Sequence, residues 1–440
     1  MPRADVASRY MEEANQEVIR NKDQYVINPG KDFSRNSKLN LDELIHLLIN
    51  MDGGSLTQEL IKFSQRTGKT ITKSALVQQR KKLRSTAFLA IQEEFVKKCA
   101  FKNKHKGYRL LAVDGTDVNI FPNEGDTLVS KPGEKPCSLM HLNAMYDICN
   151  KVFLGVVAQG KRVADERAAL IQMLPKLDQE ENAIVIADRG FESFNVMAHF
   201  VESENLDLIL RVKQGKGAIR EIASLPMTDL DCDLTIGITT SQTKEDKAAG
   251  RHFIQTGSKK GKKNSEKTAI SKWDFASPYN LKIRVVRFQL DTGKYETLVT
   301  TLPRDKFSSD DLKELYHQRW GIETAFRQLK YPTGLVNIKA KSVDMALQEI
   351  YISLIKYNYS ESIIGEVVVY QSKKNKHTYV VNHTAAIQLC LDFFRNRSKD
   401  VRKLELEILR YILPYRSGRK DKRKTIQAKS FVWFAYRIAA

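Results

Sequence analysis

The chain has 440 residues, 42% of them hydrophobic, and its 72 Lys and Arg outnumber its 52 Asp and Glu. This length suffices for roughly two or three domains with a large core, and the net charge of +20 favours a polyanionic partner, nucleic acid before an anionic membrane. Because no apolar run approaches about 18 residues and no signal-like segment opens the chain, we expect a soluble intracellular protein without membrane association.

The cysteines and histidines exclude two common kinds of site. Five cysteines and eight histidines are scattered, with no C-x-x-C and no H-x-x-x-H pair. This pattern argues against a disulfide framework and against a zinc site. Any metal ion therefore has to be held by carboxylates.

The first 106 residues are expected to be helical. Helical periodicity covers 39–52, a second helix starts from Ser55, and a third, basic helix covers 73–85. Three short helices with a tight turn favour a helix-turn-helix-like module that binds DNA. The alternative is a helical cap over a catalytic core, in which the basic QQRKKLR sequence is a solvated face.

From residue 108 onward the pattern predicts a mixed α/β sheet, in which three strands are followed by helix, strand, helix and strand. In two of the expected strands the apolar run ends in an aspartate, Asp114 and Asp188, which is taken as the end of the strand. The expected strands are 108–118, 139–148, 151–160, 182–191 and 206–213, and the expected helices are 165–177 and 194–204.

Residues 213–305 interrupt this pattern with a β-rich insertion. Its strand candidates are 234–240, 281–290 and 294–302, and a basic loop over 244–267 separates the first two. That loop is interpreted either as a solvated hairpin or as a segment that grips DNA phosphates.

The chain becomes helical again after the insertion. Ser308 and Asp311 have capping-box spacing and predict the start of a helix that continues through 315–330. A further long helix is expected over 342–362. A basic tail follows, and its segment 416–424, RSGRKDKRK, is expected to be flexible.

The helix over 315–330 carries a polar stripe beside its apolar face. With Tyr316 at 0° and about 100° per residue, Arg319, Glu323 and Lys330 fall near 300–340°, next to the apolar residues near 220–280°. An ordinary i,i+4 pair between Arg319 and Glu323, worth a few tenths of a kcal/mol, is one interpretation. The other is a functional site where this helix meets the sheet.

Three carboxylates can converge at that place: Asp114, Asp188 and Glu323. Such a set can hold two Mg²⁺ ions about 4 Å apart, which activate a water or a 3′-hydroxyl for in-line attack on phosphorus. Asp117 could also approach a metal, but Asp114 directly follows the strand. Asp147 ends a strand candidate without an expected catalytic role.

The polar neighbours of these carboxylates suit a phosphate substrate. Arg319 and Lys330 would neutralise phosphates beside the metals, and Tyr316 would donate to a phosphate or stack on a base. Glu166 and Arg167 are interpreted as a structural ion pair.

The spacing Y-x2-R-x3-E-x6-K, together with VDGTD around Asp114 and ADRGF around Asp188, resembles insertion-sequence transposases of the IS-four type, within the DDE transposase and integrase superfamily. The resemblance covers about residues 30–360. The order of the two aspartates, the β-rich insertion and the glutamate also matches. The four residues of this YREK signature are Tyr316, Arg319, Glu323 and Lys330.

The resemblance implies an RNase H-like catalytic core, a mixed sheet with flanking helices that carries the β-rich insertion. Asp114, Asp188 and Glu323 would be the catalytic metal triad, with two Mg²⁺ ions that Mn²⁺ can replace. Tyr316, Arg319 and Lys330 would contact DNA near the transposon end. Trp273, in the insertion, is a candidate support for a flipped base; a buried core tryptophan is the alternative.

The resemblance also implies the organisation and the activity. We expect a homodimer in the bacterial cytosol or nucleoid that binds terminal inverted repeats and target DNA and cleaves and transfers strands by a cut-and-paste route. Members of the family often cut the second strand through a hairpin intermediate, and another route for this strand is the alternative. A catalytically inactive DNA-binding descendant and an RNase H-like metal-dependent nuclease are the alternatives. The expected parts are an N-terminal DNA-binding domain (1–106), the core in two pieces (107–212 and 306–365), the insertion (213–305) and a helical basic C-terminal region for dimerisation or DNA contact (366–440).

Overall fold

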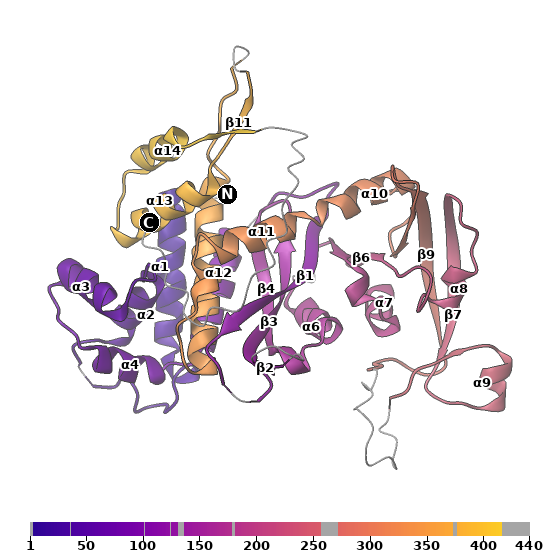
Figure 1. The fold of residues 1–440 in the computed structure, drawn as a ribbon, viewed down its shortest axis with the longest axis horizontal. Coiled ribbons are helices and arrows are strands. Elements are labelled where there is room, and N and C mark those ends of the chain that lie inside the picture. Colours follow the sequence, from indigo (N-terminus) through magenta and orange to yellow (C-terminus); the bar gives the residue numbers. More distant parts are fainter. Residues whose placement is uncertain are drawn as a thin grey trace.

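The structure, a computed structural model, is mixed α/β with one large sheet. In Figure 1 the N-terminal helices lie at one end, strands β1 to β4 at the centre, and the strands of the insertion at the other end. No helix among the described residues is long and apolar enough to cross a membrane. The structure describes residues 3–35, 37–100, 102–123, 125–130, 136–177, 181–256, 272–372 and 376–415.

The N-terminal region is helical, as predicted, and its first long helix packs against its last. The helix expected from Ser55 begins there, because the Ser55 hydroxyl accepts from the Gln58 N–H and closes a capping box. The helix expected over 39–52 is shorter, since Asn40 caps its start. The helices are α1 (Ala4–Arg20), α2 (Leu41–Ile49), α3 (Leu56–Thr67), α4 (Lys73–Lys81) and α5 (Thr86–Cys99).

Arg80, in the basic sequence of α4, is neither solvated nor available to DNA. It is buried, and its guanidinium donates to Gln348 Oε1 at 2.7 Å, to the Met345 carbonyl at 2.7 Å and to Glu349 Oε1 at 3.1 Å. These partners lie on α12 (Val343–Ile364). Arg80 therefore fixes α4 to the centre of the molecule.

The predicted order of strands and helices in the core is confirmed. Strand β1 pairs in parallel with β5 and antiparallel with β3, which also pairs with β4. The elements are β1 (Arg109–Ile120), β2 (Leu128–Val129), β3 (Cys137–Asp147), β4 (Val152–Gly160), α6 (Glu166–Met173), β5 (Ala183–Ala187), α7 (Phe194–Val201) and β6 (Leu206–Arg211).

Asp114 does not end its strand, contrary to the prediction. Antiparallel pairing with β3 carries β1 on to Ile120, whereas parallel pairing with β5 stops at Ala112. Asp114 therefore lies where β1 separates from β5, at the carboxyl end of the parallel strands.

The strands of the insertion extend the central sheet. In the described part of the chain the sheet has ten strands, in the order β2-β3-β1-β5-β6-β10-β9-β7-β8, with β4 paired to β3. Strand β10 joins the insertion to the core because it pairs antiparallel with β6. The elements are β7 (Leu230–Thr239), β8 (His252–Phe253), β9 (Tyr279–Gln289), β10 (Tyr295–Thr300), α8 (Arg220–Ala223) and α9 (Lys244–Ala248).

The basic sequence 244–267 was expected to be a loop, and its first part is not. Residues 244–248 form α9, and β8 pairs in parallel with β7. The part from residue 257 lies outside the described residues.

The helix expected over 315–330 is two helices, α10 (Ser309–Gln318) and α11 (Gly321–Lys330). At their junction the hydrogen bonds tighten to the i−3 pattern, from the Arg319 N–H to the Tyr316 carbonyl and from the Trp320 N–H to the His317 carbonyl. The predicted capping box of Ser308 and Asp311 is confirmed.

The long helix expected over 342–362 is confirmed as α12, and it is buried along most of its length. It contacts α1, α5 and α13 (His383–Arg395), so one hydrophobic cluster joins the N-terminal helices to the C-terminal ones. The remaining elements are α14 (Val401–Arg410), β11 (Thr378–Val380) and β12 (Leu413–Tyr415). The basic segment 416–424 lies outside the described residues.

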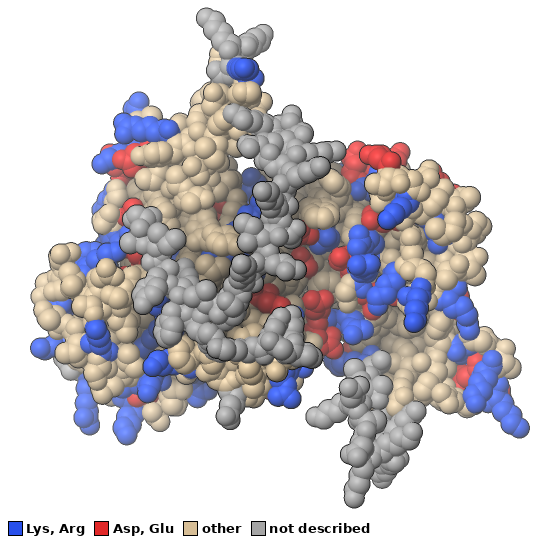
Figure 2. Space-filling view, viewed as in Figure 1, with Lys and Arg blue, Asp and Glu red and all other residues tan. Residues whose placement is uncertain are grey.

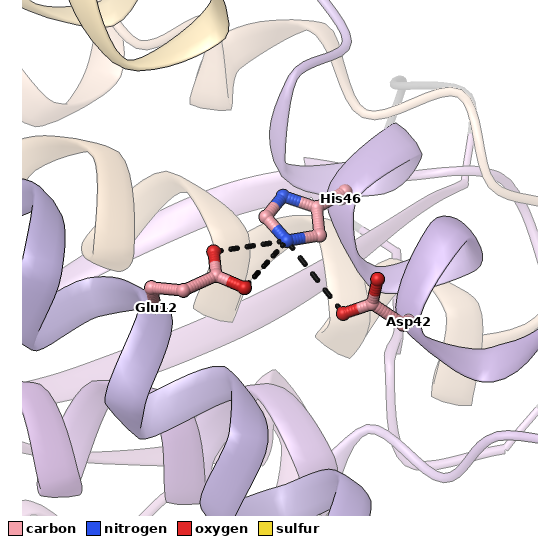
Figure 3. A group of neighbouring side chains, drawn as sticks. All are labelled: Glu12, Asp42 and His46. Carbon is pink, nitrogen blue, oxygen red and sulfur yellow. Dashed lines mark hydrogen bonds and ion pairs between the residues drawn. The ribbon is translucent and has the colours of Figure 1, made fainter. Parts of the chain in front are cut away.

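A cleft of about 980 Å³ lies between α1, α2, α3 and the end of α13. Glu12, Asp42 and His46 meet on its wall (Figure 3), with His46 Nε2 3.1 Å from Glu12 Oε2 and 3.7 Å from Asp42 Oδ1. The hydrogen bond from His46 lowers the pKa of Glu12. This ion pair, supported by Gln16, ties α1 to α2.

Candidate active site

Parallel pairing brings Asp114 and Asp188 to the same edge of the sheet. The last paired residues of β1 and β5 are Ala112 and Ile186, and each aspartate stands two residues beyond its own. Because β1 and β5 are parallel and in register, the two aspartates lie side by side just past the carboxyl ends of the paired segments. On the face of the molecule shown in Figure 2, Asp and Glu gather in the middle, in the region where Figure 1 places α11 and β1. Lys and Arg lie beside them, toward the strands of the insertion.

Asp188 is held by three groups from different elements. Its Oδ1 accepts from the Arg189 N–H at 2.7 Å, from the Tyr316 hydroxyl at 3.2 Å, and pairs with Arg211 Nε at 2.9 Å. Tyr316 is 4% exposed. Its hydroxyl therefore points at Asp188, whereas the sequence suggested a contact with phosphate or a base.

Arg319 lies between the other two carboxylates. Its guanidinium is 3.8 Å from Asp114 Oδ2 and 3.4 Å from Glu323 Oε1, and the residue is 4% exposed. Its Nε is buried without a hydrogen-bond partner among the described residues. The i,i+4 pair of Arg319 and Glu323 thus exists, but it is part of an acidic cluster rather than a surface pair.

The acidic cluster perturbs the ionisation of Asp114. Burial raises the pKa of Asp114 to about 6, and the charges of Glu323 and Glu166 add to this effect, while the Gly115 N–H and Arg319 oppose it. A partly buried carboxylate beside further carboxylates is stabilised by a bound cation. The donor atoms are all oxygens, as Mg²⁺ prefers.

The ligand oxygens of the three carboxylates do not all lie within 4.8 Å of one another. Among the described residues, Glu12, Asp42 and His46 form the group whose ligand atoms lie within 4.8 Å of one another, and the set of Asp114, Asp188 and Glu323 does not. The donor types, all carboxylate oxygens, fit a divalent metal ion, and the two-metal site stays a prediction.

Lys330 ends α11 and is half-buried. Burial lowers the pKa of Lys330, and the charge of Asp117 acts against this. Asp117 itself does not join Asp114: three residues on along β1 it faces the other side of the sheet, where it contacts His141 Nδ1 at 2.6 Å and Lys161 Nζ at 2.9 Å.

Two further acids singled out by the sequence have structural partners. Asp147 is fully buried and pairs with Arg109 at 3.0 Å. The expected Glu166–Arg167 pair is wrong, because Arg167 pairs with Asp165 at 3.7 Å, whereas Glu166 Oε1 is 3.1 Å from His141 Nε2. Neighbours in sequence at a helix start point in different directions.

Sequence reasoning missed Arg211 at this site, and it assigned Glu166, whose charge acts on Asp114, to an ion pair with Arg167. Arg211 ends β6, the strand beside β5, so its place near Asp188 follows from sheet order. A basic residue closing a strand next to an Asp-ended strand was the available signal. No sequence pattern marks the contact between His141 and Glu166.

Trp273 lies in an aromatic cluster of the insertion. Its ring meets the edges of Phe275 and Tyr279, with centroids 5.5 and 5.4 Å away, and its indole N–H donates to the Ala276 carbonyl at 3.2 Å. The residue is partly buried. Trp320, at the junction of α10 and α11, is by contrast 54% exposed beside Arg319.

Comparison with known proteins identifies the family of this chain. Residues 105–359, more than half of the chain, match the family model described as the Transposase DDE domain. The chain belongs to this family. The matched range contains Asp114, Asp188 and Glu323.

Two relatives come from insertion sequences of Escherichia coli. The transposase for insertion sequence element IS421 and the InsL protein for element IS186A of strain K12 are each 28% identical to this chain over 214 residues. The match covers 46% of this chain and 56% of each relative, so the chain spans about half the length of the curated relatives it matches. A solved structure, the cryo-EM structure of the piggyBac transposase synaptic complex with hairpin DNA, aligns at TM-score 0.45 and 14% identity, over 96% of this chain and 85% of that chain.

Proposed function

We propose that this protein is an insertion-sequence DNA transposase of the IS-four type, with an RNase H-like core. It would bind terminal inverted repeats as a homodimer and catalyse cleavage and strand transfer by a cut-and-paste route with hairpin ends. The observation that carries this proposal is the gathering of Asp114, Asp188 and Glu323 around Arg319 within a transposase DDE domain.

The proposed roles follow from the contacts. Asp114, Asp188 and Glu323 would hold two Mg²⁺ ions, or Mn²⁺ in their place. When bound, these ions supply activation of a water or 3′-hydroxyl and charge stabilisation at phosphorus. Tyr316 and Arg211 orient Asp188 through their contacts with its Oδ1.

Arg319 would act within the cluster. Its buried charge offsets the repulsion between Asp114 and Glu323. Its Nε is buried and has no partner among the described residues, so a contact with a phosphate oxygen would require the guanidinium to become exposed when DNA binds. We propose that Arg319 spaces the carboxylates and, once exposed in this way, contacts the DNA backbone.

The remaining DNA contacts are assigned by position. Lys330, at the end of α11, would neutralise a backbone phosphate near the transposon end. For a flipped base, Trp273 remains the candidate inside the insertion. Trp320 offers an exposed aromatic face closer in sequence to the site. Helices α2 to α4 would form the DNA-binding module at the N-terminal side.

The test separates DNA binding from cleavage. Asp114→Asn, Asp188→Asn and Glu323→Gln should each bind a terminal-repeat fragment like the wild type in gel shifts but fail to nick it in Mg²⁺. Asp305→Asn is the matched control, because this aspartate is exposed. Near-normal nicking by one of the three site variants would remove that residue from the triad.

A further inference from the structure

The cleft between α1, α2, α3 and the end of α13 has a cationic wall. This wall carries Arg66, from the last turn of α3, and Arg395, the last residue of α13, followed by Arg397 and Lys399. Arg66, Arg397 and Lys399 are exposed, and their side chains form no ion pair or hydrogen bond within the part of the chain that the structure describes. Three positive charges in the cleft therefore lack an acidic partner.

The acidic side chains of the same cleft already have partners. These pairs are Glu12 and Asp42 with His46 (Figure 3), Glu43 with Lys69, and Asp5 with Arg3. Since the carboxylates are engaged on the side of α1 and α2, the unpaired charge of the cleft is positive and lies on the side of α3 and α13.

Two of the arginines destabilise each other's charge. Burial lowers the pKa of Arg66, and the charge of Arg395 lowers it further, while Asp52 and Glu59 oppose this effect. Arg395 is half-buried and pairs with Asp52 and Asp392, but its Nε is buried without a hydrogen-bond partner among the described residues. Like charges held together in a cleft are stabilised by a bound ion of opposite sign.

Arg397 holds a backbone conformation that favours glycine. Its N–H donates to the Phe394 carbonyl at 3.1 Å, and the Ser398 N–H donates to the Phe393 carbonyl at 3.0 Å, which is the Schellman pattern at the end of α13. The residue at this position is left-handed, and Arg397 has a φ of 48°. An arginine here is strained where a glycine is not. The sequence thus keeps a charged side chain on the cleft wall at a place where folding alone favours glycine.

We propose that this cleft is a phosphate-binding site, in which Arg66, Arg397 and Lys399 contact phosphate oxygens. Guanidinium groups match phosphate because their forked donors can bind two oxygens at once. The ligand is a phosphodiester of the DNA backbone, since α2 and α3 belong to the proposed DNA-binding module. The assignment to DNA rests on the proposed function, whereas the phosphate chemistry does not. None of the residues that line this cleft belongs to the candidate active site.

Arg397→Gly separates the charge from the fold. Glycine adopts the left-handed conformation without strain, so the melting temperature should not fall below that of the wild type. Arg66→Gln removes a second charge at an exposed position. We expect the double variant to bind a DNA duplex at least about tenfold more weakly. The slope of the logarithm of its binding constant against the logarithm of the salt concentration should be smaller by about two. Arg402→Gln is the matched control, because Arg402 is an exposed arginine of α14 outside the cleft.

The experiment measures the fluorescence anisotropy of a labelled terminal-repeat duplex with the full chain in EDTA, at several salt concentrations. A second arm compares melting temperatures in inorganic phosphate and in chloride at equal ionic strength. Weaker DNA binding in the double variant, with wild-type binding in Arg402→Gln, supports the proposal.

The other outcomes separate the two sources of phosphate. If the double variant binds DNA like the wild type, but inorganic phosphate raises the melting temperature of the wild type alone, the ligand is a small phosphate compound and the DNA source is refuted. Wild-type DNA binding in the double variant and no effect of inorganic phosphate refute the site. A wild type that binds no DNA contradicts the proposed function itself.

Discussion

Asp114→Asn should stabilise the metal-free protein while abolishing cleavage. In the absence of a cation, the folded state holds the Asp114 carboxylate partly buried beside Glu323 and Glu166, which raises its pKa from about 3.8 to about 6. The unfolded chain has no such penalty. Asparagine keeps an oxygen that can accept from the Gly115 N–H, now 2.9 Å from Asp114 Oδ1, and carries no charge.

The magnitude follows from the pKa. A pKa difference of about 2 corresponds to about 3 kcal/mol at pH values above 6. The Asp114 side chain is 27% exposed and its substitution also removes a contact with Arg319 at 3.8 Å, so we expect a gain nearer ~1–2 kcal/mol. For a chain of this length that is a rise in melting temperature of roughly 2 °C.

The stability gained by Asp114→Asn should depend on pH. Because the pKa is raised in the folded state, the folded protein takes up a proton before the unfolded chain does as the pH falls through about 6. The wild type therefore loses its penalty between about pH 6 and pH 4, and the advantage of Asp114→Asn should be present at pH 8 and vanish near pH 4. Thermal melts in EDTA across this range measure it. A variant less stable than the wild type at pH 8, or a gap that does not change with pH, would refute the reasoning.

Three further predictions use other parts of the molecule. Arg80→Ala removes three hydrogen bonds to α12 and should lower the free energy of unfolding, measured in urea, by about 2–4 kcal/mol. Its control, Lys81→Ala, changes an exposed position and should leave this free energy unchanged, while it weakens binding to transposon-end DNA in gel shifts. Tyr316→Phe removes the hydroxyl that donates to Asp188 and should lower the cleavage rate about tenfold in single-turnover assays, with about 1 kcal/mol lost in stability; an unchanged rate would exclude an orienting role. Lys330→Ala should reduce, by about one, the slope of the logarithm of the binding constant for transposon-end DNA against the logarithm of the salt concentration. An unchanged slope would argue against a phosphate contact.

Local patterns were enough to predict most of the core. The capping box at Ser308 and the strand before Asp188 depend on neighbours in sequence, and both were found where expected. The end of β1 was predicted wrongly because antiparallel pairing with β3, which is not encoded locally, continues the strand past Asp114. The break at Arg319 was also missed, since the sequence there retains the spacing of one continuous helix.

At the candidate site, too, contacts within one helix could be predicted from the sequence, and contacts between distant segments could not. Spacing alone suggested that Glu323 and Arg319 share a face, and the structure places them 3.4 Å apart. Contacts that cross the sheet were not predictable in this way. Glu166 reaches His141 because α6 packs on β3 and β1, and the sequence-adjacent Arg167 was the wrong partner.

The most direct measurement uses purified protein and labelled DNA that carries the element's own terminal repeat, incubated with Mg²⁺ or with EDTA and resolved on denaturing gels. We predict nicking at the repeat boundary in Mg²⁺, none in EDTA, and a hairpin product at the transposon end. Tight binding without cleavage in either Mg²⁺ or Mn²⁺ would contradict the account and favour a catalytically inactive DNA-binding descendant.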